Sequence, residues 1–380
     1  MTVPAVIVGG GLAGGATACL LARAGRPVLL LERDAGPAPK ICGEFVSAEA
    51  AMYLRRLGID LATLGAQPIG RLRLVRGRMT VRAALPFAGF GLSRQILDEA
   101  LLRRAEACGA EVRRGQAVGL ARTQGGIVLE AGTASEVRPS TLFLATGKHD
   151  LRGLRRRTRP RPEELVGFKL HLRLSPTQEH EMRGHVDVML FPDGYAGLQL
   201  VEGGMANLCL LVGRERLRRA GGTWAALLDD LRRAEPHLDA RLDGASPLAE
   251  RPVSISRVPY GFVHAPSADD APGVFRLGDQ VGVIPSFTGD GMSIALHSAA
   301  VAAGAYLGGF DAAEYHRRIR RDIAGQIGRA GAMYQLARGA LGQASLMRLA
   351  GVWPSGLGWA AALTRVSPRA LAHAEAAYAP

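Results

Sequence analysis

The sequence is poor in cysteine, with four thiols in 380 residues: Cys19, Cys42, Cys108 and Cys209. None belongs to a Cys-x-x-Cys pair, which excludes the common zinc and dithiol motifs. So few cysteines in a long chain are typical of a reducing cytosol rather than of a secreted, disulfide-linked protein. The N-terminus has no basic stretch ahead of its first apolar segment, so no signal peptide is expected. We therefore expect a cytoplasmic protein, with the periphery of a membrane as the alternative.

Long apolar runs and acidic residues are also scarce. The longest apolar candidate, residues 346–363, is interrupted by Arg348 and Pro354 and does not reach the length of a membrane span. Asp and Glu number 34 against 47 Lys and Arg, which gives a net charge of +13. This excess fits an anionic ligand or an acidic membrane surface, or simply an arginine-rich composition. Nucleic acid is not an expected partner, because no basic helix with interleaved aromatics and no nucleic-acid-binding motif is visible.

The first 34 residues contain a complete strand–turn–helix–strand unit. An apolar run at Val6–Val8 leads into a glycine-rich turn, a helix follows to about residue 24, and a second apolar run ends at Glu32. Gly9 permits a tight turn, Gly11 lets a pyrophosphate approach the backbone, and Gly14 allows close packing of the helix on the sheet. The helix N-terminus favours phosphates, and Glu32 can accept a hydrogen bond from a ribose. This context predicts a dinucleotide-binding site.

A second motif lies far downstream. A strand at residues 273–277 leads to Gly278-Asp279, and a turn containing Gly289 and Gly291 precedes a helix from about Ser293. Asp279 would accept hydrogen bonds from hydroxyl groups, while the glycines and the helix N-terminus would allow close approach of a polar ligand. Taken with the first motif, this pattern resembles the FAD-dependent oxidoreductases built like para-hydroxybenzoate hydroxylase. The resemblance implies an enzyme with bound FAD, and NAD(P)H or another reductant as a transient electron donor.

The helix that begins at Ser93 also resembles one of that family, in which an arginine approaches the cofactor. The cofactor-binding residues expected from both motifs and this helix are Gly9, Gly11, Leu12, Ala13, Gly14, Glu32, Arg33, Arg94, Val118, Gly278, Asp279, Gly289, Asp290, Gly291 and Met292. For Asp98, in the same helix, a solvated helix face is an equally good interpretation.

Two further segments narrow the resemblance. Lys40–Glu44, which ends in Cys-Gly-Glu, is similar to a segment of geranylgeranyl reductases, and Phe191-Pro192 looks like the Phe-Pro turn of that group. The resemblance places Cys42 near flavin and substrate, where its thiol is the candidate catalytic proton donor. A small buried hydrophobic residue is the alternative for this cysteine. The residues expected around the substrate are Cys42, Glu44, Phe45, His171, Phe191, Tyr195 and Phe287.

Other features set limits on that interpretation. The Trp-x-Trp-x-Ile-Pro signature of halogenases is absent. The aromatic residues that precede Phe-Pro in geranylgeranyl reductases are replaced by Val188-Met189-Leu190, which argues against a long prenyl substrate. The hydroxylases' Ala-Asp-Gly is replaced by Ala145-Thr146-Gly147, which argues against their usual handling of NAD(P)H. A lone strand histidine such as His171 is more often structural, and no metal site is expected, since no histidine lies in a metal-binding spacing.

The expected fold is α/β (α+β overall). It consists of a three-layer Rossmann-like FAD-binding domain with an inserted antiparallel β-sheet substrate domain and a C-terminal helical segment. We expect residues 1–75, 92–165 and 262–310 in the FAD-binding domain, 76–91 and 166–261 in the β-rich domain, and 311–380 in the helical segment. The basic stretch Arg152–Arg161 is interpreted as a solvated loop, with a diphosphate, an acyl carrier or a membrane face as alternative partners.

The expected reaction is geranylgeranyl reductase-like reduction of a C=C bond by flavin hydride. The expected substrate is a hydrophobic small molecule such as an isoprenoid, a quinone or a polyketide-like compound. The first alternative is an NAD(P)H- and O₂-dependent flavin monooxygenase acting on an aromatic or polyketide substrate. The second is a non-catalytic flavin-binding protein. A peripheral membrane surface or an acyl carrier is a possible additional partner, and the oligomeric state is left open.

Overall fold

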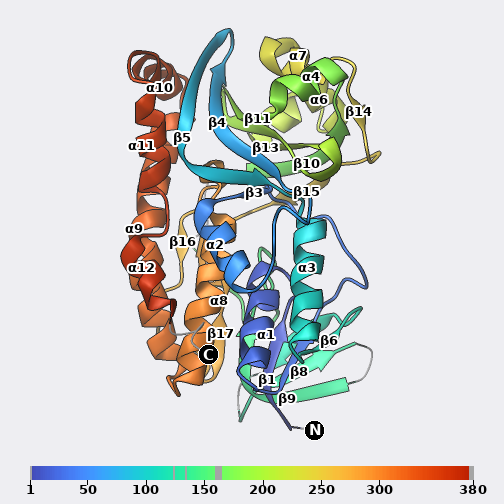
Figure 1. Ribbon diagram of the computed structural model, residues 1–380, viewed down its shortest axis with the longest axis vertical. Coiled ribbons are helices and arrows are strands. Elements are labelled where there is room, and N and C mark those ends of the chain that lie inside the picture. The colour runs from blue at the N-terminus through green and yellow to red at the C-terminus, as the bar shows by residue number, and fades with distance from the viewer. Residues whose placement is uncertain (1, 123–124, 133–134, 159–164, 376–380) are drawn as a thin grey trace.

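The structure is a computed structural model that describes residues 2–122, 125–132, 135–158 and 165–375. Two large β-sheets lie one above the other in Figure 1, and the C-terminal helices form a column along one side of both. The glycine-rich motifs lie in the lower half, and the sheet of the upper half covers them. No helix among the described residues is both long enough and apolar enough to cross a bilayer.

The first sheet is built around β1 (Thr2–Val8), which pairs in parallel with β2 (Val28–Leu31) on one side and β9 (Ser135–Leu144) on the other. Within the described residues it has seven strands. The remaining strands are β6 (Glu111–Arg113), β7 (Val118–Arg122), β8 (Val128–Ala131) and β17 (Val274–Arg276). Strands β6, β2, β1, β9 and β17 run parallel, whereas β7, β8 and β9 form an antiparallel meander.

Alternating side chains of β1 explain the three layers. Ala5 and Ile7 are buried in the core formed with the helices, and Val6 and Val8 are buried in the core formed with the meander. The helices of the first core are α1 (Leu12–Arg23), α2 (Ala48–Arg56), α3 (Arg94–Ala107) and α8 (Gly291–Leu307). Serine side chains cap two of these helices: Ser47 Oγ accepts from Ala50 N and Ser93 Oγ accepts from Ile96 N, both at 3.3 Å.

The second sheet has nine strands within the described residues. They are β3 (Phe45–Val46), β4 (Gln67–Arg76), β5 (Met79–Gly91), β10 (Leu165–Arg173), β11 (Gly184–Phe191), β12 (Gly194–Leu200), β13 (Ala206–Gly213), β14 (Ser246–Pro247) and β15 (Val253–Ser256). Most neighbours are antiparallel, as expected, but β4 and β11 pair in parallel. The expected β-rich domain begins at residue 76. Because β3 and β4 also belong to the second sheet, this sheet takes in residues before that boundary. The alternation of β4 predicts a strand but does not say which sheet it joins.

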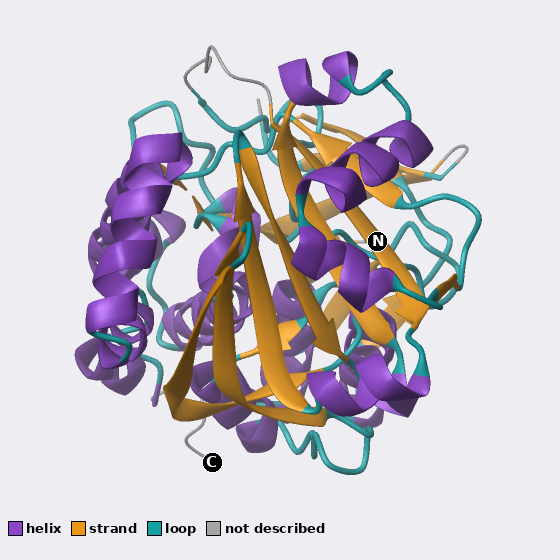
Figure 2. Cartoon of the chain, turned by 90° about the horizontal axis from the view of Figure 1, so that it is seen from above, coloured by secondary structure: helices purple, strands orange, loops and turns teal. Residues whose placement is uncertain are grey.

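Helices cover one face of the second sheet, as Figure 2 shows, and the C-terminal helices stack at its side. The covering helices are α4 (Pro176–Met182), α5 (Arg214–Arg219), α6 (Trp224–Ala234) and α7 (Pro236–Leu242). The C-terminal column contains α9 (Ala312–Arg338), α10 (Ala340–Val352), α11 (Ser355–Leu363) and α12 (Pro368–His373). A small pair, β16 (Phe262–Val263) and β18 (Gly282–Val283), links the sheets to this column. The uncovered face of the second sheet looks onto the glycine-rich motifs.

Candidate functional site

The first glycine turn requires glycine at two positions. Gly9 has φ +105°, and a Cβ there would lie 2.5 Å from Ala145 O. A Cβ on Gly14 would lie 1.8 Å from Gly9 O, so α1 packs against the turn at a distance that only glycine permits. This fixes the N-terminus of α1 at the end of β1.

Glu32 is held in place at the end of β2. Its carboxylate accepts hydrogen bonds from Gly10 N and from Asp34 N, the latter at 3.0 Å. Lys40 Nζ lies 2.6 Å from Asp34 and 3.9 Å from Glu32. The Glu32 carboxylate is therefore fixed by the backbone beside the glycine turn, where it can accept a hydrogen bond from a ribose hydroxyl.

A cavity of about 440 Å³ opens above this turn. Among the predicted cofactor residues, it is lined by Gly9, Gly11, Glu32, Arg33, Arg94, Val118 and Asp279. Gly11 is the N-cap of α1 and no side chain caps the first turn of that helix. The N–H groups of the first turn therefore lack a side-chain partner and are suited to a phosphate.

A second cavity of about 150 Å³ lies under the second sheet. Among the predicted residues, it is lined by Gly11, Leu12, Ala13, Cys42, Glu44, Phe45, Arg94, Tyr195, Gly278, Asp279, Gly289, Gly291 and Met292. The two cavities share Gly11, Arg94, Lys148 and Asp279, so they are halves of one elongated site. The N-terminus of α8 opens into this half and, like that of α1, has no side-chain cap. Two uncapped helix N-termini on one elongated cavity fit FAD, which is long and carries its charge at the pyrophosphate.

Lys148 stands where the two halves meet. Its Nζ lies 3.1 Å from Asp279 Oδ2. Burial alone would lower the pKa of Lys148, but the charge and hydrogen bond of Asp279, together with Tyr260 and Cys42, outweigh burial and raise the pKa. Arg156 supports the same junction, since it donates to Asp279 O at 3.0 Å and to Lys148 O at 2.6 Å.

Arg156 is the exception to the interpretation of Arg152–Arg161 as a solvated loop, in which Arg152, Arg155 and Arg157 are exposed. Arg156 is buried, and its Nε lies 2.6 Å from Asp150 Oδ1. This residue therefore ties the Asp279 turn to the Ala-Thr-Gly-Lys turn. Residues 159–161 of the stretch lie outside the described residues.

Arg94 reaches the glycine turn from α3. It forms a two-point ion pair with Asp98, with distances of 2.8 and 2.9 Å. A Cβ on Gly11 would lie 3.2 Å from Arg94 Nη2, so the guanidinium borders the space beside the turn. Asp98 is buried rather than part of a solvated helix face, and it holds Arg94 against the site.

The Cys-Gly-Glu segment is anchored by a buried carboxylate. Glu44 is fully buried at φ +60°, a conformation that costs energy for a residue with a Cβ. Its carboxylate accepts hydrogen bonds from Lys169 Nζ and, at 2.8 Å, from Arg94 N, and His171 Nε2 lies 2.7 Å away. Burial opposes ionisation of Glu44, but the hydrogen bond with His171 and the charge of Lys169 outweigh it and lower the pKa of the carboxyl.

Amide side chains of the second sheet hold the backbone of the same segment. Asn207 Nδ2 donates to Cys42 O at 3.1 Å and to Gly43 O at 2.8 Å, and Gln199 Nε2 donates to Glu44 O at 2.8 Å. Cys42 Sγ accepts a hydrogen bond from Glu44 N at 3.3 Å. The thiol is thus fixed in the wall of the second cavity by residues from three strands.

Strand register explains which residues of the sheet face the site. Lys169 pairs with Cys209, and His171 pairs with Asn207, so these four share one face. Asn207 in turn pairs with Gln199 of β12. The opposite face carries Phe168, Leu208 and Leu210, which pack in the core beneath α6. Burial raises the pKa of the Cys209 thiol to about 12, so this second cysteine stays protonated.

Hydroxyl groups line the cavity opposite Cys42. Tyr195 Oη forms a hydrogen bond with Ser286 Oγ, and Ser286 Oγ donates to Tyr260 Oη at 3.1 Å. Burial raises the pKa of Tyr260 to about 12, so its phenol remains neutral. The three hydroxyls form a short chain of groups that can both donate and accept hydrogen bonds.

Several predicted site residues do not line the cavities. Phe191 is fully buried in the core under the helices, because the pleat of the β11–β12 pair places it on the face opposite Tyr195. Phe287 lies behind Tyr195, with ring centroids 6.4 Å apart. His171 contacts Glu44 and Gly14 contacts Gly9, so both support the site from behind. Asp290 is fully buried, and its carboxylate lies 2.7 Å from Arg365 Nη1 rather than facing the cavity.

Sequence reasoning also missed residues that the structure brings to the site. They are Lys148, Arg156, Lys169, Gln199, Asn207, Cys209, Tyr260 and Ser286. A signal existed for part of this set: Lys169, Gln199 and Asn207 are polar residues inside otherwise apolar strands. A buried polar residue in a strand needs a partner, which here is the Cys-Gly-Glu segment. For Lys148, Tyr260 and Ser286 we find no comparable pattern.

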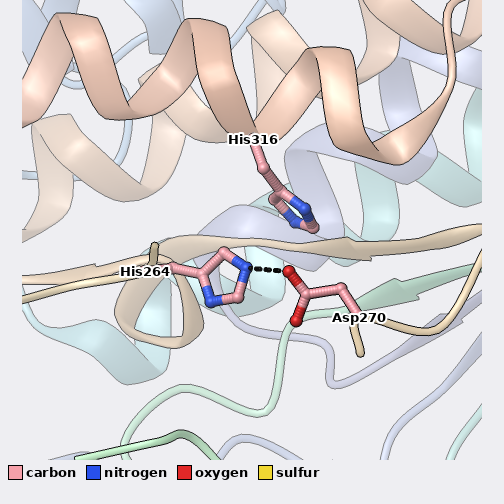
Figure 3. Close-up of side chains that lie close together, drawn as sticks. All are labelled: His264, Asp270 and His316. Carbon is pink, nitrogen blue, oxygen red and sulfur yellow. Dashed lines mark hydrogen bonds and ion pairs between the residues drawn. The ribbon is translucent and has the colours of Figure 1, made fainter. Parts of the chain in front are cut away.

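One group of possible metal ligands occurs among the described residues, formed by His264, Asp270 and His316 (Figure 3). His264 Nε2 lies 3.0 Å from Asp270 Oδ2, and Arg276 N donates to His316 Nε2 at 3.1 Å. Burial lowers the pKa of His316 to about 3, so its imidazole is neutral and its Nδ1 carries the proton. With one nitrogen accepting a hydrogen bond and the other protonated, His316 has no lone pair free for a metal ion.

Comparisons with known proteins agree with this geometry. Residues 2–138 match the family model described as FAD binding domain. The chain therefore contains an FAD-binding domain, and the expected cofactor FAD is confirmed. No curated protein sequence matches the chain at a significant level.

Solved structures with the same fold belong to several kinds of flavin enzyme. A geranylgeranyl bacteriochlorophyll reductase-like protein from Thermoplasma acidophilum is 18% identical, with a TM-score of 0.74 over 98% of this chain and 95% of that chain. A triple mutant of the flavin-dependent brominase Bmp2 is 17% identical, with a TM-score of 0.73 over 98% and 97%. A mutant of the halogenase PltM in complex with FAD is 15% identical, with a TM-score of 0.73 over 97% and 89%. At these identities the likeness shows the fold, and the predicted fold class is confirmed.

Proposed function

We propose that this FAD-dependent oxidoreductase reduces a carbon–carbon double bond of an apolar small molecule bound in the second cavity. The observation that carries the proposal is the fixed position of Cys42, in the cavity wall, with its main chain clamped by Asn207. The structural likeness to a geranylgeranyl bacteriochlorophyll reductase-like protein, along almost the whole length of both chains, supports the same reaction class.

The chain would hold FAD along the elongated cavity. Glu32 lies at the end suited to the adenosine ribose, the N-terminus of α1 suits the pyrophosphate, and Asp279 suits the ribityl hydroxyls. When bound, FAD supplies the hydride chemistry that no side chain can provide. Saturating a double bond takes one hydride equivalent and one proton, so the chain itself has to deliver the proton.

Cys42 is the residue best placed to deliver that proton. Because its sulfur already accepts the N–H of Glu44, the S–H bond is directed away from that amide. Arg94 and Lys148 line the same cavity and interact electrostatically with Cys42, so positive charge lies near the sulfur. Once the product has left, water enters the cavity and returns a proton to the sulfur. The apolar wall, which includes Phe45, Leu211 and Met292, excludes water and orients the substrate.

The apolar wall of the second cavity favours an apolar substrate. An isoprenoid, a quinone or a polyketide-like compound would place apolar surface against Phe45 and Met292 and its polar end near the hydroxyls of Tyr260 and Ser286. Those hydroxyls also favour a second candidate function. They would suit a phenol-like substrate of an O₂-dependent hydroxylase that uses NAD(P)H, because a phenol both donates and accepts hydrogen bonds.

One experiment separates these functions. Purified protein is loaded with FAD, photoreduced without oxygen, and mixed in turn with an aromatic enone and a short prenyl compound. The proposal expects reoxidation of the flavin and a product that has gained two hydrogen atoms. Absence of anaerobic turnover, together with NADPH-driven O₂ uptake that a phenol stimulates, would establish the hydroxylase instead. Flavin binding without either reaction would leave a non-catalytic flavin-binding protein.

A further inference from the structure

The C-terminal helices expose most of the large apolar side chains that reach solvent. Among the described residues, eleven large apolar side chains are exposed, and seven of them lie between residues 336 and 363. These seven form what we call the C-terminal apolar face: Leu336, Leu341, Leu349, Val352, Trp353, Trp359 and Leu363. Leu341 and Val352 are 86% and 87% exposed. A concentration of this kind marks an interaction surface, whereas single exposed apolar residues do not.

The geometry of α10 shows that this exposure is not incidental. Gln343, Met347 and Ala350 form its buried side, and Met347 and Ala350 pack in a core with Leu74 and Val81 of β4 and β5. Leu341, Arg348 and Val352 are spaced by seven and four residues, so they form a stripe on the outer side. Figure 1 shows α10 and α11 as the outermost layer of the molecule on this side. The helix is thus largely apolar on both sides, with Gln343 as the polar residue of the inner side and Ser345 and Arg348 as those of the outer side.

The chain segments that form this face carry basic side chains but no acidic ones. From residue 323 to residue 374 the chain contains no Asp or Glu. Of its five arginines, Arg329, Arg348 and Arg369 are exposed and Arg338 is half-buried, whereas Arg365 is buried against Asp290. The β4–β5 hairpin, which packs against α10 and α11, has no acid between Asp60 and Asp98. Arg78 and Met79 at its turn are both exposed, so the hairpin extends the same surface. The hairpin and the C-terminal helices, two segments without acidic residues that are far apart in sequence, therefore lie side by side (Figure 1).

We propose that the C-terminal apolar face docks on an anionic lipid bilayer. Trp and Leu side chains on short helices, with arginine beside them, are suited to lie in the headgroup region of a membrane. Arginine can keep its charge at the phosphates while its stem contacts apolar surface, and basic residues near an anionic leaflet strengthen binding. A second copy of the chain is a poorer occupant, because a twofold interface would place this acid-free, basic surface against itself.

The C-terminal helices that carry this face also lie directly behind the second cavity. Arg365, two residues after the end of α11, has its Cζ 4.0 Å from the ring centroid of Phe87 and 5.9 Å from that of Phe45, which lines the cavity. Its Nη1 lies 2.7 Å from Asp290, next to the glycines of the cavity wall. A lipid-soluble substrate could thus enter close to the membrane. The docking itself does not depend on the proposed reaction.

Vesicle sedimentation tests the docking with the intact, FAD-loaded protein. We expect sedimentation with vesicles of phosphatidylcholine and phosphatidylglycerol, little with phosphatidylcholine alone, and release at high salt because surface charges are screened. Fluorescence of Trp353 and Trp359 should shift to shorter wavelength on binding. The double variant Leu341→Ser/Val352→Ser, at two strongly exposed positions, should weaken partitioning about tenfold or more.

A matched control has two exposed apolar residues replaced elsewhere, Leu248→Ser/Phe310→Ser, and should bind as the wild type does. Flavin absorbance of each variant verifies its fold. Absence of binding to anionic vesicles at low salt would overturn the proposal, as would equal binding of the two double variants. A concentration-dependent dimer that Leu341→Ser/Val352→Ser abolishes, without any vesicle binding, would identify a second copy as the occupant.

Discussion

His171 lies on β10, and its Nε2 is 2.7 Å from the carboxylate of Glu44. The two residues are more than a hundred positions apart in the sequence. Lys169 supplies the positive charge that balances this fully buried carboxylate, and the carboxylate anchors the Cys-Gly-Glu segment. A buried carboxylate that loses its cation is strongly unfavourable, whereas removal of both charges is much less so. The second sheet therefore sets the position of Cys42 through an ion pair rather than through packing alone.

The Lys169→Met variant should be destabilised by about 3–5 kcal/mol, because Glu44 would be left buried without its cation. Urea unfolding followed by circular dichroism measures this free energy. In the double variant Glu44→Gln/Lys169→Met, most of the loss should be recovered, since no charge remains to be buried. Equal destabilisation of the single and double variants would show that Lys169 contributes through packing only.

Replacement of Glu32 by Gln should weaken FAD binding without unfolding the protein. The amide oxygen keeps an acceptor for Gly10 N, but the NH2 group cannot accept from Asp34 N, and the negative charge offered to the ribose is lost. A hydrogen bond to a charged group is worth about 1.5–3 kcal/mol, so the dissociation constant should rise roughly 10- to 100-fold. Titration of apoprotein with FAD, followed by quenching of flavin fluorescence, measures this. The exposed Glu111→Gln, at the end of the neighbouring strand, serves as the control and should bind FAD unchanged.

The glycine turn could be predicted from sequence because its determinants are local. Gly9 and Gly14 are required by contacts with the turn and with the strand end beside it, and Glu32 is fixed by the backbone of the same unit. The caps at Ser47 and Ser93 were predictable for the same reason. Apart from Ala145, which follows the distant strand β9 and borders Gly9, each partner lies within the same supersecondary unit.

The wall of the second cavity was harder to predict because it depends on register between distant strands. Phe191 and Tyr195 are four residues apart, yet the hairpin places them on opposite faces of the sheet. Asp290 adjoins two glycines of the cavity wall, but its direction is decided by Arg365, which lies far along the chain. Periodicity identifies the strands, whereas the direction of each side chain follows from pairings that no local pattern records.

Cys42→Ala should lower anaerobic turnover roughly 100-fold or more, which is the usual effect of removing a proton donor, while FAD binding stays unchanged. Cys209→Ala is the matched control, because Cys209 lines the same cavity but its raised pKa keeps the thiol protonated. Single-turnover kinetics with photoreduced enzyme separate the chemical step from substrate binding. Similar losses in both variants would show that the cysteines shape the cavity rather than supply the proton.

The neutral imidazole of His316 should make the protein less stable in acid. Burial lowers its pKa from 6.5 to about 3, so between these values the unfolded chain binds a proton that the folded chain does not. The free energy of unfolding should therefore fall as the pH decreases through this window, by roughly 2 kcal/mol between pH 7 and pH 5 from this group. His316→Gln, whose amide oxygen can accept the Arg276 N–H, removes the titrating group and should show a correspondingly smaller loss. Urea unfolding at both pH values measures the difference, and equal pH dependence in variant and wild type would contradict the assignment of a neutral buried His316.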